Sequence, residues 1–239
     1  MAPPILFDRG IAISAKHGPT YQGMLITEPE ARAAAANYYT WGATGVAYWN
    51  VGIHFGSRPT AADEQRERIR GWTSAVHDPA LVFEGPRLYH FLPMGKGMRQ
   101  RKPPVRNYPW ADEGSSPLGQ PNSPVLTFAA DKVGERQVFP FRMADGRDGE
   151  QLKGTLQFRV YHLSRDDKLD IDINGIEVKP EDIGRLEVEP RTELTGTRYV
   201  IELADCPPFR GKNALGLTLQ SAPKAAIAPY MEELEVLVK

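Results

Sequence analysis

The segment KLDIDINGIEV, residues 168–178, decides how the second half of the chain folds. Apolar and polar residues alternate from Leu169 to Ile173, which is the two-residue period of a strand with one buried face. Asn174-Gly175 follows, and an Asn-Gly pair is the strongest short signal for a two-residue hairpin turn because both residues tolerate positive φ. The segment therefore predicts a β-hairpin whose apolar face packs into a core.

The same two-residue period recurs on both sides of this hairpin. It is found in GTLQFRVYHL (154–163), TRYVIEL (197–203), NALGLTL (213–219) and EELEVLVK (232–239). Short strands separated by turn residues, with almost no helical pattern, are typical of an antiparallel β-sandwich. We predict such a sandwich, of the jelly-roll type, over residues 125–239. Asp170 and Asp172 alternate with apolar residues and are expected on the solvent face of their strand.

Residues 1–95 follow a different pattern, which predicts a strand-helix-strand-helix (βαβα) order. The expected elements are a strand over 24–26, a helix that begins at the N-cap Thr27 and stops at Gly42, a strand over 44–51 and a helix over 60–78. Helical spacing predicts one inward face on the first helix, made of Ala31, Ala34, Ala35 and Tyr38. A strand, a helix and a strand joined this tightly indicate a parallel crossover.

Residues 96–124 are rich in proline, glycine, serine and charge and show no periodicity, so we expect a linker or a long wrapping loop. The chain is thus predicted to be an α+β multidomain protein. It has three parts: the βαβα segment of 1–95, the linker of 96–124 and the β-sandwich of 125–239.

Two stretches of the first segment resemble a known family. EARAAAANYYTWGATGVAYWN (30–50) and HDPALVFEGPRLYHF (77–91) are similar to the last part of bacterial glycosyl-hydrolase-like (β/α)8 barrels. The second half resembles the galactose-binding-type β-sandwich that often follows such barrels, through its Asn-Gly turn and a G-x-N-x-L motif at Gly211, Asn213 and Leu215. The resemblance implies a partial barrel remnant, because a complete barrel needs about 250 residues. It also implies carbohydrate as the partner and an exported or periplasmic location.

The barrel resemblance implies candidate site residues at the carboxyl ends of the predicted strands. Glu28 follows the strand at 24–26, where barrel enzymes place a catalytic carboxylate, although an acid in a first helical turn is also favoured by the helix dipole. Trp49 and Asn50 end the next strand and offer sugar an aromatic platform and an amide, or else are a core Trp and a turn Asn. Three loop residues would share that face, or have no role: His17, Tyr21 and His54.

Composition and spacing argue against several other classes of function. A net charge of −1 and a pI near 6.5 give no basic surplus for nucleic acid, and no apolar run reaches the length of a membrane span. The opening MAPPILFDRG lacks the segments of a signal peptide. The histidines lack metal-ligand spacing, no cofactor fingerprint is present, and DGRDGE (145–150) favours a turn over a calcium loop. Cys206 is expected to be a small buried residue.

Three functional hypotheses follow. The first is a carbohydrate-contacting protein derived from a glycoside hydrolase, which binds polysaccharide or oligosaccharide. The second is a hydrolase whose site is completed by another chain, with Glu28 as one of the two carboxylates that glycoside hydrolysis requires. The third is a structural module without activity. Because the open edge of an incomplete sheet associates with other surfaces, we also expect a homo-oligomer or docking of the sandwich over that edge. A missing barrel half is the other expected partner.

Overall fold

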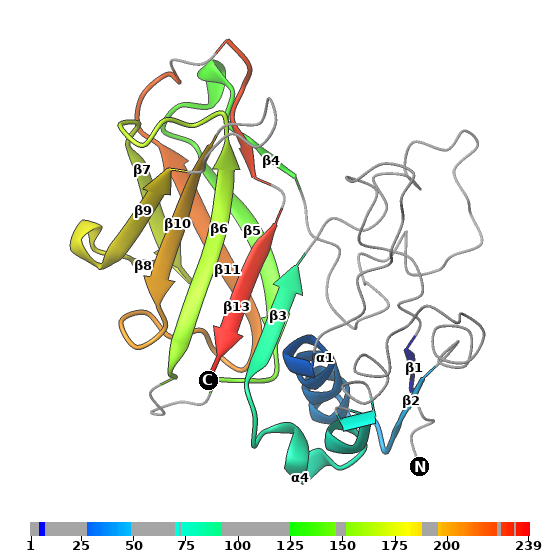
Figure 1. Ribbon diagram of the computed structural model, residues 1–239. Helices are drawn as coiled ribbons and strands as arrows, with labels where there is room; N and C mark the ends of the chain where they lie inside the picture. The colour runs from blue at the N-terminus through cyan, green and yellow to red at the C-terminus, as the bar shows by residue number, and fades with distance from the viewer. Residues whose placement is uncertain are drawn as a thin grey trace, which may run out of the picture. The chain divides into compact units, whose positions relative to one another are not determined.

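The computed structural model describes residues 5–7, 28–48, 70–71, 73–91, 125–146, 152–187, 196–223, 226–231 and 233–239. The chain divides into a first compact unit, Met1–Leu88 with Pro117–Gly119, and a second one that holds the other residues. Most of the described residues lie in antiparallel β-sheets, and the helices are few (Figure 1).

The first unit contains a parallel strand pair joined through a helix. Its elements are β1 (Ile5–Phe7), α1 (Glu28–Thr40), β2 (Val46–Tyr48) and the short α4 (Pro79–Val82). β1 pairs with β2 in parallel, with Ile5 opposite Val46. The predicted helix and the strand after it are thereby confirmed, but the sequence analysis did not identify β1. The predicted strand at 24–26, the cap at Thr27 and most of the predicted helix at 60–78 lie outside the described residues. A barrel is not seen among the described residues of this unit.

Helix α1 ends as its sequence predicts but is buried more completely. Gly42 has φ +93°, the left-handed conformation that favours glycine after a helix, and its N–H donates to the carbonyl oxygen of Tyr39 at 3.0 Å. The predicted inward face is confirmed as buried, and the residues between its members are buried as well: Arg32, Ala33, Ala36 and Asn37. Eight consecutive buried residues exceed two helical turns, so every face of this part of α1 is covered.

Two antiparallel sheets form the second unit. The larger sheet has the strand order β3-β13-β6-β10-β9, and β12 pairs with β4 and β6. Its strands are β3 (Arg87–Phe91), β4 (Leu126–Thr127), β6 (Gly154–Tyr161), β9 (Ile183–Glu187), β10 (Gly196–Glu202), β12 (Tyr230–Met231) and β13 (Leu234–Val238). The smaller sheet has the order β5-β11-β7-β8, with β5 (Arg136–Met143), β7 (Leu169–Ile173), β8 (Ile176–Glu177) and β11 (Gly211–Leu219). Short 3-10 turns precede β5 and β9, at Ala130–Lys132 and Pro180–Asp182.

The core of this unit lies where the two sheets meet. Alternate residues of each strand are buried, as in β6, where Leu156, Phe158 and Val160 alternate with half-buried polar residues. Across the core, the ring of Phe91 in β3 contacts that of Phe141 in β5 with centroids 5.5 Å apart. This arrangement of antiparallel strands with one buried face agrees with the predicted β-sandwich.

Strand β3 joins a sheet that the sequence analysis did not assign to it. Its residues were grouped with the βαβα segment of 1–95, yet β3 pairs with β13, and Figure 1 shows the two strands running in opposite directions. Tyr89 and Phe91 are buried, while their chain neighbours Leu88 and His90 are half-buried. This alternation is the same signal that identified the later strands, and it places the side chains of β3 in the core of the sandwich.

The hairpin predicted over residues 168–178 is confirmed in detail. β7 and β8 pair with Ile173 opposite Ile176, so the turn holds two residues. Asn174 and Gly175 both have positive φ, 57° and 82°, as a type I′ turn requires.

Candidate functional site

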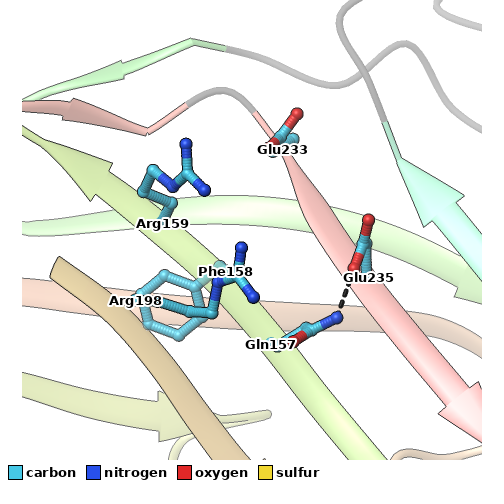
Figure 2. Close-up of a pocket in the computed structure, with 6 residues that line it drawn as sticks. All are labelled: Gln157, Phe158, Arg159, Arg198, Glu233 and Glu235. Atoms are coloured by element: carbon cyan, nitrogen blue, oxygen red, sulfur yellow. Dashed lines mark hydrogen bonds between the residues drawn. The ribbon is translucent and has the colours of Figure 1, made fainter. Parts of the chain in front are cut away.

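A pocket with a polar lining lies on the outer face of the larger sheet (Figure 2). Its lining comes from three neighbouring strands and the residue before one of them: Gln157, Phe158, Arg159, Arg198, Glu233 and Glu235. The polar members are half-buried and alternate with core residues, so they stand on the face opposite the core. Beneath them, Phe158 stacks on Tyr199 at 5.1 Å, and burial raises the pKa of Tyr199 to about 12. The charged and amide groups of the pocket therefore lie on the opposite side of the sheet from this apolar core.

Strand register brings two arginines together in this pocket. Arg159 of β6 lies directly opposite Arg198 of β10. Side chains directly opposite each other on one face have Cβ atoms only about 5 Å apart, and like charges in such pairs destabilise a sheet. Figure 2 shows both guanidinium groups over the outer face of the sheet.

The glutamates of the pocket differ in their surroundings. Glu235 of β13 lies opposite Gln157, whose Nε2 donates to its carboxylate. The ring Nε2 of His90 on β3 lies 3.6 Å from the Oε1 of Glu235 on the other side. Glu235 is thus contacted by both neighbouring strands. Glu233 comes just before β13 and borders the pocket near Arg159 (Figure 2).

Aromatic rings continue the outer face beside Arg159. The guanidinium carbon of Arg159 lies 5.4 Å from the ring centroid of Tyr161, two residues further along β6. Tyr161 stacks on Tyr230 of β12, with centroids 4.7 Å apart and planes 18° from parallel. Tyr161 itself is buried, whereas Tyr230 is half-buried and also has the ring of His162 near it, with centroids 5.8 Å apart. Charged, amide and aromatic groups therefore lie next to one another on this face.

Of the six residues predicted for the site, the structure describes Glu28. It is the first residue of α1, and its Oε1 accepts from Nε of Arg32 at 2.8 Å and lies 2.8 Å from Nη2. Arg32 also donates to the carbonyl oxygens of Leu81 and Val82, the latter at 3.3 Å. Glu28 therefore belongs to an ion pair through which α1 is anchored to α4. The other five lie outside the described residues: His17, Tyr21, Trp49, Asn50 and His54.

Asn213 of the G-x-N-x-L motif has a structural role. Its side chain is buried, and its Oδ1 accepts from the backbone N–H of Phe209 at 2.7 Å and from Nδ2 of Asn174 at 2.9 Å. Its Nδ2 donates to the carbonyl oxygens of Phe209 at 2.8 Å and Gly211 at 3.1 Å. The Oδ1 of Asn174 in turn accepts from the N–H of Ala214 at 2.9 Å. The motif thus joins the Asn-Gly turn to the loop before β11.

The remaining candidates are placed as follows. Cys206 is buried, as predicted, and burial raises the pKa of its thiol. Asp145, at the start of DGRDGE, is buried and accepts a hydrogen bond from the hydroxyl of Tyr89, whereas residues 147–150 lie outside the described part. Among the described residues, no three His, Cys, Asp or Glu side chains gather as metal ligands would. No helix in that part of the chain has the length and apolar character needed to cross a bilayer.

The residues of the outer-face pocket were not predicted from the sequence. Arg159 and Arg198 are 39 positions apart and meet only through the register of β6 and β10. The alternation within each strand places both on an outer face, but the pairing of the two strands is set by the whole fold. A scan against protein-family models matches no family, and a search of curated proteins gives no match.

Proposed function

We propose that the protein binds carbohydrate, as a relative of a glycoside hydrolase that keeps polysaccharide contact. The observation that carries this proposal is the polar pocket beside the stacked Tyr161 and Tyr230. Arginine, glutamine and carboxylate groups form hydrogen bonds with sugar hydroxyls, since they supply several donors and acceptors in fixed planes. A partly exposed tyrosine ring provides a flat apolar surface for the CH-rich face of a sugar.

The family resemblance supports the same proposal. In this proposal, the βαβ unit of β1, α1 and β2 is a remnant of a (β/α)8 barrel, and the two antiparallel sheets are a jelly roll of the carbohydrate-binding type. The missing barrel half or a second copy of the chain would cover the open edge of the β1-β2 pair, and the protein would work in an exported or periplasmic setting. Binding needs no pair of catalytic carboxylates, and Glu28 is engaged by Arg32, which favours binding over hydrolysis.

A depletion assay tests the proposal. The purified chain is incubated with insoluble cellulose, chitin, xylan and cross-linked polygalacturonate, and the protein left in the supernatant is measured. We expect depletion by one polymer class, and a loss of that depletion in Tyr230→Ala, which removes the half-buried ring. Lys239→Ala at the exposed C-terminus is the matched control. If every polymer leaves the supernatant unchanged, the proposed function is wrong.

Trp49→Ala in the same assay separates the two possible surfaces. A loss of depletion in Trp49→Ala, with Tyr230→Ala unaffected, would assign binding to the predicted barrel face and not to the sandwich.

A further inference from the structure

Among the residues that the structure describes, neither arginine of the outer-face pocket forms an ion pair, although Glu233 and Glu235 line the same pocket. Arg32 pairs with Glu28 and Arg136 pairs with Asp172, whereas Glu235 lies beside His90 and not beside either arginine of the pocket. Two positive side chains directly opposite each other therefore repel, without a carboxylate bound between them. An arrangement that costs stability in the free protein suggests that something else compensates it.

Arg159 also has a donor without an acceptor. Its Nε is buried and has no hydrogen-bond partner. Buried donors are almost always satisfied in proteins, and leaving one unsatisfied destabilises the fold. Figure 2 shows the guanidinium of Arg159 on the same side of β6 as Arg198, and Glu233 lines the same pocket. An acceptor held between the two arginines would reduce their repulsion.

We propose that the pocket binds the anionic group of an acidic saccharide, a carboxylate or a sulfate ester, between Arg159 and Arg198. This proposal rests on the proposed function and names the class of sugar. Guanidinium groups present paired donors whose geometry matches the two oxygens of such an anion.

The other wall of the pocket fits the rest of such a ligand. Glu233 is an acceptor and would repel a bare anion, but it accepts hydrogen bonds from the hydroxyls of a sugar ring. Glu235, with Gln157 and His90 as neighbours, is already engaged by the protein. An acidic saccharide therefore meets arginines at its charged end and a carboxylate at its hydroxyl-bearing ring, whereas inorganic phosphate or sulfate alone lacks the second contact.

The experiment compares polymers that differ in charge alone. Affinity electrophoresis at low and high salt measures binding of the full chain to two pairs of polymers. The first pair is polygalacturonate and its fully methyl-esterified form, and the second is dextran sulfate and dextran. We expect tight binding to polygalacturonate or dextran sulfate and at least tenfold weaker binding to the uncharged counterpart. The polymer that binds also decides between carboxylate and sulfate.

Variants then locate the contact. Arg159→Ala and Arg198→Ala are each expected to weaken binding of the acidic polymer about tenfold or more, and Arg198→Lys to restore part of it, because lysine keeps the charge but not the paired donors. Arg210→Ala, an exposed arginine outside the pocket, is the matched charge control and should leave binding unchanged. The Tm of Arg198→Ala should equal or exceed that of the wild type, because like-charge repulsion is removed.

The possible results separate the two proposals. If an uncharged polymer binds as well as its acidic counterpart, or if both arginine variants keep full affinity, the pocket does not select an anion, while carbohydrate binding itself stands. If no polymer binds at all, both proposals are wrong. A marked fall in the Tm of Arg198→Ala would show that the arginine pair stabilises the sheet, and would remove the reason for expecting a ligand there.

Discussion

Asn213→Ala tests how much of the sandwich depends on one buried amide. The substitution removes four hydrogen bonds, to the N–H and carbonyl of Phe209, the carbonyl of Gly211 and the side chain of Asn174. A hydrogen bond contributes about 1 kcal/mol net, and water can reach part of the exposed Phe209 loop, so we expect a loss of about 2 to 4 kcal/mol in the free energy of unfolding. With an m-value of about 1 to 1.5 kcal/mol/M for a unit of this size, the urea midpoint falls by about 2 M.

The assay must report on the sandwich alone. The chain has four tryptophans, Trp41, Trp49, Trp72 and Trp110. The first three belong to the first unit and Trp110 to the second, so tryptophan fluorescence reports mainly on the first unit. Far-UV circular dichroism near the β-sheet minimum reports the sheets, and tryptophan fluorescence serves as a second probe for the rest of the chain. We expect the first probe to shift in Asn213→Ala, and the second to shift less or not at all.

Two further variants identify the cause of the loss. Asn213→Asp keeps the shape and both accepting contacts but places a second acceptor against the carbonyls of Phe209 and Gly211. This variant should be at least as destabilised as Asn213→Ala at neutral pH. Its stability should recover partly when acid protonates the new carboxylate. Lys212→Ala, exposed and adjacent, should change the free energy of unfolding by less than about 0.5 kcal/mol. If Asn213→Ala costs no more than Lys212→Ala, the amide is not what holds the Asn-Gly turn to the loop before β11.

Three other predictions concern glycines and charge within the sheets. The guanidinium of Arg136 lowers the pKa of Asp172 through two hydrogen bonds of 2.6 Å. This pair therefore stabilises the fold above the unfolded carboxyl pKa of about 3.9, and the stabilisation is lost as the pH falls through the lower pKa of the folded state. The difference in urea stability between wild type and Asp172→Asn should vanish at low pH. Gly216→Ala should remove the same pH-dependent difference, because a Cβ there would lie 1.9 Å from Oδ2 of Asp172 and 2.5 Å from Nε of Arg136. Gly154 has φ +141°, and a Cβ there would lie 1.8 Å from the carbonyl oxygen of Leu237. Gly154→Ala should therefore lower the free energy of unfolding by about 3 kcal/mol or more and lower the Tm. An unchanged Tm would contradict the described pairing of β6 with β13.

The elements that could be predicted are those whose signals are local. The Asn174-Gly175 turn and the helix stop at Gly42 each depend on a few adjacent residues, and both are confirmed by positive φ values. Strand β1 could not be found, because three residues are too few to show a period and its partner β2 is about 40 residues away. The ion pair of Arg136 with Asp172 illustrates the same limit: it crosses β11 above Gly216, so it exists only once three strands lie in register.

The pocket was missed for a similar reason. Nothing near Arg159 in the sequence indicates that Arg198 is its neighbour, and an isolated arginine on a polar strand face carries no functional signal. The predicted sugar contacts at Trp49, Asn50, His17, Tyr21 and His54 stay predictions, and the role of Glu28 beyond its ion pair with Arg32 does too. The pocket was therefore unpredictable because the pairing of distant strands is not encoded locally, and not because its residue types are unusual.

The pairing of β3 with β13 bears on how the sandwich could move between genes. β3 is separated from the next described strand by the proline-rich residues 96–124, yet its Tyr89 and Phe91 are buried and Phe91 packs against Phe141. A recombination event with its breakpoint in the proline-rich stretch would transfer a sandwich without an edge strand, leaving β13 unpaired on that side. A fragment that begins after Phe91 would therefore leave β13 without this neighbour, whereas one that begins before Arg87 would keep it.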